Sequence, residues 1–225
     1  MSENEGTKIT IRKANLQVLD VELLGATDLI CSSAPKQIAK ITDKAARKAK
    51  ALKGNLPDDL DAAEPTGGPD DQFRASLYRV EGADGFFFPS SAIQRALATY
   101  LQRFNPINPK YARDTSPVVY GATFMVDEML PIVAVEGPIM RHDIARNSRG
   151  KLIDVYRGSF KGWKLNARIE FDADVITKDR LLDGLHHAGR KVGIGAWRPE
   201  RSGRFGRFTL GAVSLTKGSA EEVAA

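Results

Sequence analysis

The residue types best suited to chemistry lie near the end of the chain, in a segment rich in glycine and arginine. Between Arg190 and Arg207 there are six cationic residues and one carboxylate, with Trp197 and Phe205 among them. Glycine lets the backbone approach a ligand, arginine pairs with phosphate, and an aromatic ring stacks a base for roughly 1–3 kcal/mol. This combination predicts a nucleic-acid-binding loop formed by Arg190, Lys191, Gly193, Gly195, Trp197, Arg198, Arg201, Gly203, Arg204 and Arg207.

A structural alternative for the same segment is a tight turn in which Trp197 is a core anchor and the arginines are merely solvated. A dinucleotide-binding loop or a P-loop is disfavoured, because the segment follows a predicted helix instead of opening one and lacks the Lys-Ser/Thr pair of a P-loop.

Two further basic segments are candidates for phosphate contacts. Pro35 to Lys53 has apolar residues at three- and four-residue steps and predicts a helix, whose exposed face would carry Lys40, Lys44 and Arg47. Residues 138–164 predict an inserted basic loop or flexible hairpin with Arg141, Arg146, Arg149, Lys151, Arg157 and Lys161. Ordinary solvated surfaces are the alternative for both segments.

The charge distribution favours a polyanionic partner. Residues 54–72 hold six carboxylates and no lysine or arginine, so the net charge of +5 for the whole chain becomes +11 for the remainder. The proline and glycine content of this acidic segment predicts a flexible linker, which could occupy the basic groove until a strand displaces it. A strongly basic folded body is typical of proteins that bind nucleic acid.

Several classes of function are disfavoured by the composition. Cys31 is the single cysteine, so neither an intrachain disulfide nor a thiolate metal cluster is expected, and His186 and His187 would point about 100° apart on a helix. We therefore expect no metal, no cofactor and no enzymatic activity. The alternative is a metal-dependent nuclease that uses Asp28, or Asp172 and Asp174. Apolar runs of only a few residues and an acidic N-terminus predict a cytoplasmic protein with no membrane span.

The hydrophobic periodicity predicts one mixed α+β domain over residues 1–225. Residues 8–24 are predicted as a central strand, 75–80, 118–127 and 131–136 as further strands, and the stretch after Ser90 as a helix. The strict alternation from Leu165 to Asp172 predicts a half-buried strand. A helix after Thr177 and closing strands at 192–197 and 204–215 are predicted to follow it. This order is typical of an RRM-like or ferredoxin-like fold.

Three segments, taken in order, also resemble known proteins: residues 25–30 (Gly-Ala-Thr-Asp-Leu-Ile), residues 88–93 (Phe-Pro-Ser-Ser-Ala-Ile) and the terminal glycine- and arginine-rich block. They resemble a group of phage and prophage proteins, and the layout is similar to the RAMP superfamily, especially the backbone subunits of CRISPR interference complexes. This resemblance implies an RRM-like palm that polymerises along a guide RNA. It also implies phosphate contacts from the palm, the glycine-rich loop and a thumb-like hairpin, which would correspond to Met140 to Lys161.

The loop residues implied by the resemblance are Gly193, Gly195, Arg198, Arg201, Gly203, Arg204 and Arg207. The chain has no repeat-processing histidine pattern, so processing endonuclease activity is not implied. We therefore expect a protein that coats single-stranded RNA or DNA as a homo-oligomer, with other phage or CRISPR-type subunits as further candidate partners. Alternatives are a protein-only oligomer or virion component, and an inhibitor that mimics a CRISPR backbone subunit.

Overall fold

The computed structural model of the chain describes residues 14–33, 68–146 and 152–217. Its centre is a four-stranded antiparallel sheet in the order β4-β8-β1-β9. In chain order, its strands and the helices between them are β1 (Leu16–Gly25), α3 (Ser91–Phe104), β4 (Thr123–Met125), β8 (Lys164–Asp172), α5 (Lys178–Lys191) and β9 (Phe208–Lys217). This strand–helix–strand, strand–helix–strand order with β8 inserted between β4 and β1 is the ferredoxin-like or RRM-like arrangement, as the sequence predicted.

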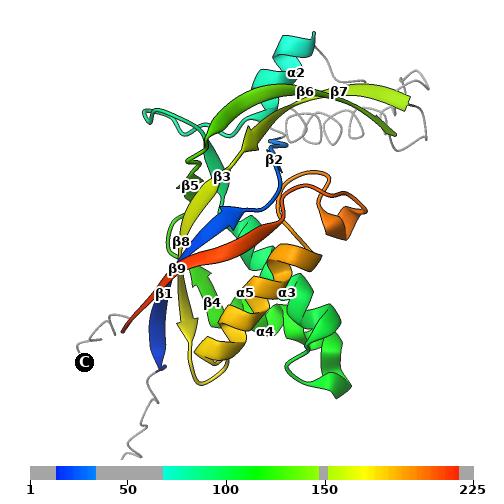
Figure 1. The fold of residues 1–225 in the computed structure, drawn as a ribbon. Helices are drawn as coiled ribbons and strands as arrows, with labels where there is room; N and C mark the ends of the chain where they lie inside the picture. The colour runs from blue at the N-terminus through cyan, green and yellow to red at the C-terminus, as the bar shows by residue number, and fades with distance from the viewer. Residues whose placement is uncertain (1–13, 34–67, 147–151, 218–225) are drawn as a thin grey trace, which may run out of the picture.

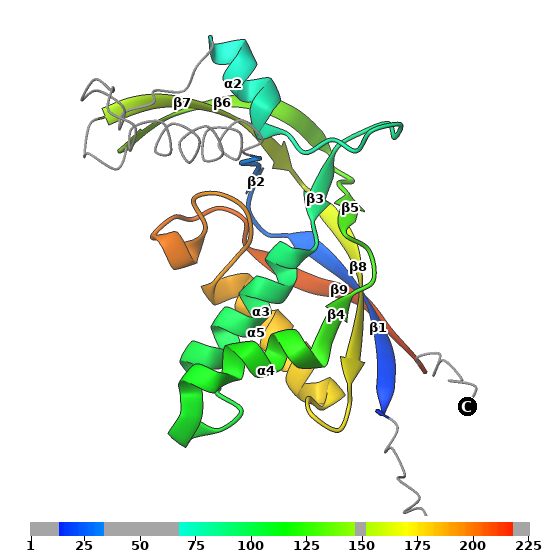
Figure 2. The same cartoon turned by 180° about the vertical axis from the view of Figure 1, so that it is seen from behind.

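The sheet has one buried and one open face. Leu19, Val21 and Leu23 of β1 alternate with polar neighbours, and the register pairs Leu19 with Ile169 and Leu23 with Leu165 of β8. Because successive strand residues point to opposite faces, these side chains all enter the core on the side covered by α3 and α5 (Figure 2). β1 pairs with a strand on each side, which confirms its predicted central position.

The two covering helices begin and pack as the residue pattern requires. Ile93, Leu97 and Leu101 of α3 form its buried stripe, and the Thr177 hydroxyl accepts a hydrogen bond from the Arg180 backbone N–H at the start of α5. Gly184 lets the helices approach closely, since a Cβ there would lie 2.7 Å from Leu97 Cδ1.

A second layer stands above the sheet as an arm (Figure 1). The long strands β6 (Glu136–Arg146) and β7 (Leu152–Lys161) form an antiparallel pair, and β2 (Leu29–Ile30) joins the β7 edge. Helix α2 (Pro69–Ser76) packs on β7, where the Ser76 hydroxyl accepts a hydrogen bond of 2.8 Å from the Gly158 N–H. β3 (Phe87–Pro89) and β5 (Met129–Pro131) pair beside the arm. Of the two predicted forms of the basic segment, the hairpin is the observed one.

Four predicted strands are wrong in whole or in part. Residues 75–80 are not a strand, because Pro69 starts a helix that ends at Ser76, and only an isolated bridge from Tyr78 to Phe87 follows. Residues 118–122 belong to helix α4 (Thr115–Ala122), since burial of Val119 beneath α3 outweighs the strand preference of valine and tyrosine. Residues 192–197 form a loop. The strand predicted at 131–136 is also wrong, because β5 ends at Pro131 and only an isolated bridge from Val133 to Lys164 follows before β6.

Short 3-10 helices, η1 (Pro109–Asp114) and η2 (Pro199–Arg201), complete the described elements. The predicted helix over 35–53 lies outside the described residues, as do residues 54–67 of the predicted acidic linker, and Pro69 to Gln72 of that linker belong to α2. Within the described ranges, no helix is long and apolar enough to cross a membrane.

Candidate nucleic-acid interface

The glycine-rich loop connects α5 to β9 in a defined backbone path. Gly195 and Gly206 have φ values of +78° and +65°, a region in which residues with a Cβ are strained. The Ala196 N–H donates to Ile30 O at 2.9 Å, and the Gly206 N–H donates to Asp28 O at 2.8 Å. The loop is therefore hydrogen-bonded to the turn between β1 and β2, and its shape is set before any ligand binds.

Arg198 stabilises this loop from within. Its Nε and Nη2 donate to Glu200 Oε2 at 2.9 and 2.6 Å, and its Nη1 donates to Gly195 O at 3.0 Å. Burial acts to raise the pKa of Glu200, but the hydrogen bonds and charge of Arg198 outweigh it and hold that pKa below its usual range. Arg198 therefore crosslinks the loop from within, and its predicted phosphate contact stays a prediction.

The other loop arginines point outward. Arg201, Arg204 and Arg207 are exposed, and none of them forms an ion pair with a carboxylate of the described residues. Arg204 lies over the Phe205 ring with its guanidinium carbon 5.3 Å from the ring centroid. Unpaired guanidinium groups beside an aromatic ring are suited to phosphates and bases.

The hairpin β6–β7 meets the loop at the same ring. Arg141 of β6 places its guanidinium carbon 4.5 Å from the Phe205 centroid and donates from Nε to Asp143 at 2.9 Å. Arg157 is paired with Arg141 across the two strands. Burial lowers the pKa of Arg157, and the charge of Asp143 opposes that shift. We call Arg141, Arg157, Arg204, Phe205 and Arg207 the basic site.

The opposite side of the hairpin has a different character. The His142 ring stacks on Tyr156 with centroids 4.6 Å apart, and His142 Nε2 lies 2.6 Å from Asp154 Oδ1. Gly158, on the same side, faces Leu77, the residue that follows α2. This side is therefore partly covered by α2, and the arginines lie on the side toward the loop.

A pocket of about 360 Å³ lies between the first turns of α3 and the loop. Its polar lining includes Ser91, Arg95, Tyr78 and the Arg198–Glu200 pair, together with the backbone of residues 193–196. Arg95 is exposed, and sequence reasoning missed it because one arginine on a predicted amphipathic helix is typical of any solvated face. Only the position of Arg95 beside the loop makes it a candidate.

The remaining predicted residues are distributed as follows. Lys161 pairs with Glu136 at 3.0 Å, and Lys191 lies over the Phe104 and Tyr100 rings on the helical side of the molecule. Trp197 is half buried with φ +53°, and its Nε1 has no hydrogen-bond partner within the described ranges. Gly193 and Gly203 lie in the loop, Arg190 is exposed in the last turn of α5, and Arg146 ends β6. Outside the described residues lie Lys40, Lys44, Arg47, Arg149 and Lys151.

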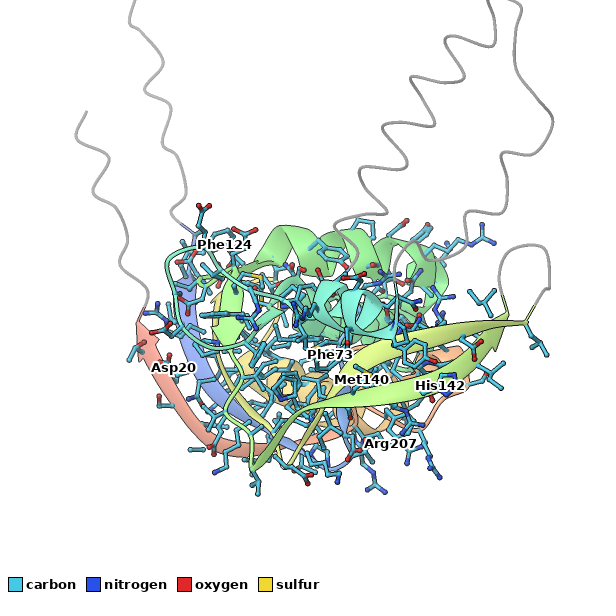
Figure 3. The ribbon with its side chains drawn as sticks, turned by 90° about the horizontal axis from the view of Figure 1, so that it is seen from above. Asp20, Phe73, Phe124, Met140, His142 and Arg207 are labelled. Carbon is cyan, nitrogen blue, oxygen red and sulfur yellow. The ribbon has the colours of Figure 1, made fainter. Side chains whose placement is uncertain are left out.

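The open face of the sheet is not the interface that an RRM would use. An RRM stacks bases on aromatic side chains of this face, but here Asp20, Glu22 and Glu170 occupy it. Phe124, at the edge strand β4, is the outward-facing aromatic residue in the described parts of these four strands. Figure 3 places Asp20 and Phe124 apart from the hairpin residues Met140 and His142.

Two of the residues considered for catalysis, Asp172 through its carboxylate and Asp28 through its backbone carbonyl, accept hydrogen bonds that shape turns. The Asp172 carboxylate accepts a hydrogen bond of 3.0 Å from the Asp174 N–H in the turn after β8, and Asp28 O accepts from the loop. Burial raises the pKa of the Cys31 thiol to about 12. In the part of the chain that the structure describes, no three histidine, cysteine or carboxylate side chains are grouped as metal ligands.

No protein-family model matches the sequence, and a search of curated proteins gives no significant match. Among solved structures, the crystal structure of Cmr6 from Pyrococcus furiosus is similar with a TM-score of 0.41 and 12% sequence identity, over 86% of this chain and 98% of that chain.

Proposed function

We propose that this protein binds single-stranded RNA or DNA at the basic site and coats the strand in several copies. The observation that carries this proposal is the convergence on the Phe205 ring of Arg204, which forms no ion pair with a carboxylate of the described residues, and Arg141, which an ion pair with Asp143 holds in place. Two segments that lie more than sixty positions apart in the sequence thereby bring their arginines to one place.

The chemistry of the site favours binding of single strands without sequence preference. Arginine forks contact phosphate oxygens, which are the same in every nucleotide, and a phenylalanine ring stacks on the π-face of any base. A base in a duplex is already stacked, so an aromatic contact of this kind favours single strands. Arg207, on the outer side of the loop, is placed to extend the phosphate contacts.

Binding of labelled single strands of RNA and DNA, measured by fluorescence anisotropy over a range of salt concentrations, tests this function. With six to eight phosphates neutralised per copy, affinity should fall roughly a thousand-fold between about 50 and 200 mM salt. Salt-independent binding, or binding to duplex as tight as to single strand, contradicts the proposal. The comparison of RNA with DNA identifies the strand.

A protein-only oligomer is the second candidate, and the opposite charges of two regions favour it. The open face of the sheet carries Asp20, Glu22 and Glu170, of which Glu22 lies 3.6 Å from Lys164, while Arg204 and Arg207 of the loop form no ion pair with a carboxylate of the described residues. These surfaces could join neighbouring copies without nucleic acid. Light scattering after size exclusion, before and after nuclease treatment, separates the two: assemblies that shrink with nuclease support strand coating, and assemblies of unchanged size support the protein-only oligomer.

A further inference from the structure

A row of stacked rings lies on the helical side of the molecule, beyond the basic site. His187 stacks on Tyr100 and Tyr100 stacks on Phe104, each with centroids 5.6 Å apart and planes within 26° of parallel. Lys191 Nζ lies 4.8 Å from the Phe104 centroid. We call these four side chains the aromatic row. Phe104 forms its outer end and is 54% exposed.

The packing of α3 against α5 holds this row in place. The close approach at Gly184 brings the last turns of the two helices together, so that Tyr100 meets His187. The end of α3 is fixed as well, because Arg180 Nη2 donates to the carbonyl of Asn105, the residue after Phe104, at 2.8 Å. An exposed ring on an anchored helix end loses little conformational freedom when a ligand stacks on it.

Cations border the aromatic row. Arg103 precedes Phe104 in α3, Arg190 precedes Lys191 in α5, and both arginine side chains are exposed. Lys191 forms no ion pair with a carboxylate of the described residues. Two acids also lie close: Asp183 is 3.3 Å from His187, and Glu200 is 3.5 Å from Arg103. The positive groups therefore predominate at the exposed end of the row, next to Phe104.

The row is connected to the glycine-rich loop. Lys191 precedes the loop glycine Gly193 by two residues, and Arg103 contacts Glu200 of η2 within that loop. The aromatic row and the glycine-rich loop are therefore neighbouring surfaces. Phe124, a comparably exposed phenylalanine, instead lies on the sheet near Asp127 and Glu170, where a polyanion is repelled.

We propose that the aromatic row is a second binding site for the same single strand, in which an unpaired base stacks on Phe104 and Lys191 contacts a flanking phosphate. This inference rests on the proposed function and adds a named stacking position to it. It predicts that strands long enough to reach both sites bind more tightly than strands that fill the basic site alone.

The test compares Phe104→Ala with the control Phe124→Ala on short and long single strands. Loss of one base stack should weaken long-strand binding about 5- to 10-fold for Phe104→Ala, and leave short-strand binding unchanged. Phe124→Ala should bind both lengths like the unaltered protein. Equal long-strand affinity for the two variants overturns the second site.

A second readout uses Phe104→Trp and Phe124→Trp. The two natural tryptophans are common to both proteins, so the difference from the unaltered protein reports the new indole. Tryptophan at position 104 should be quenched when a long strand stacks on it, and tryptophan at position 124 should not. Equal quenching at both positions, or at neither, overturns the inference.

The possible failures are distinguishable. If the unaltered protein binds no single strand, the proposed function itself fails. If it binds but Phe104→Ala changes only the size of the assembly in light scattering, the aromatic row is a protein contact and the second site is wrong. Equal thermal melting temperatures of the variants exclude a general loss of folding.

Discussion

The outer face of the sheet and the glycine-rich loop both contain cations, but the loop leaves some of its cations without an acidic partner among the described residues. On the sheet, Arg168 pairs with Asp127 at 2.9 Å and Lys164 lies 3.6 Å from Glu22. On the loop, Arg204 and Arg207 are exposed and form no ion pair within the described ranges. The comparison teaches that net charge alone does not locate a binding surface. The surface is located by the cations that have no acidic partner nearby.

The strongest test of this difference reverses the loop charges. Arg204→Glu combined with Arg207→Glu should weaken single-strand binding at least about 100-fold, because each charge-assisted contact contributes roughly 1.5–3 kcal/mol. Anisotropy titration measures the affinity. The matched control is Lys110→Glu with Arg113→Glu on η1, which changes the net charge equally and should have a much smaller effect. Equal losses in both pairs would mean that binding depends on total charge alone.

The aromatic part of the basic site is tested by Phe205→Ala. Loss of a stacking ring should weaken binding roughly 10-fold, and Phe205→Trp should restore most of the affinity because an indole also stacks. Arg141 loses its ring contact in the alanine variant. If alanine and tryptophan at position 205 bind alike, the site is purely electrostatic.

The internal support of the loop is tested by Glu200→Gln. The carboxylate is 8% exposed and accepts two hydrogen bonds from Arg198, so the variant should lose about 1–3 kcal/mol of stability. Because folding lowers the pKa of Glu200, its stabilising contribution is complete above its unfolded-state pKa and is lost as pH falls through the lower folded-state pKa. When the pH is lowered, the melting temperature of the variant should therefore fall less than that of the unaltered protein. If both melting temperatures fall equally with pH, this role of Glu200 is contradicted.

The smallest effect is expected on the outer face of the sheet. Asp20→Asn with Glu22→Gln should change strand affinity by no more than about 2-fold, since Asp20 lies apart from Arg207 of the basic site in Figure 3 and Glu22 is on the same face of β1 as Asp20. If this pair alters affinity more than Phe205→Ala does, the strand binds on the sheet. The same variant should disrupt assemblies if a protein-only oligomer forms through this face.

Regular elements with uninterrupted patterns were predictable. The alternation over 165–172 and the apolar stripe from Ile93 to Phe104 are local patterns, and both elements form as predicted, except that Phe104 at the end of the stripe is exposed. The α4 helix was not predictable in this way. Its residues 118–120 favour a strand locally, and it is the packing of Val119 beneath α3 that decides its structure.

The sequence alone determined the order of strands and helices and the concentration of arginine and glycine near the end of the chain. Only the tertiary structure decided the use of those arginines: Arg198 is held by Glu200, whereas Arg204 shares the Phe205 ring with Arg141 of the hairpin. A residue pattern reports neighbours two to four positions apart, because that is the reach of a strand or a helix turn. The contact between Arg141 and Phe205 spans a much longer separation, and it forms through the packing of the arm above the sheet.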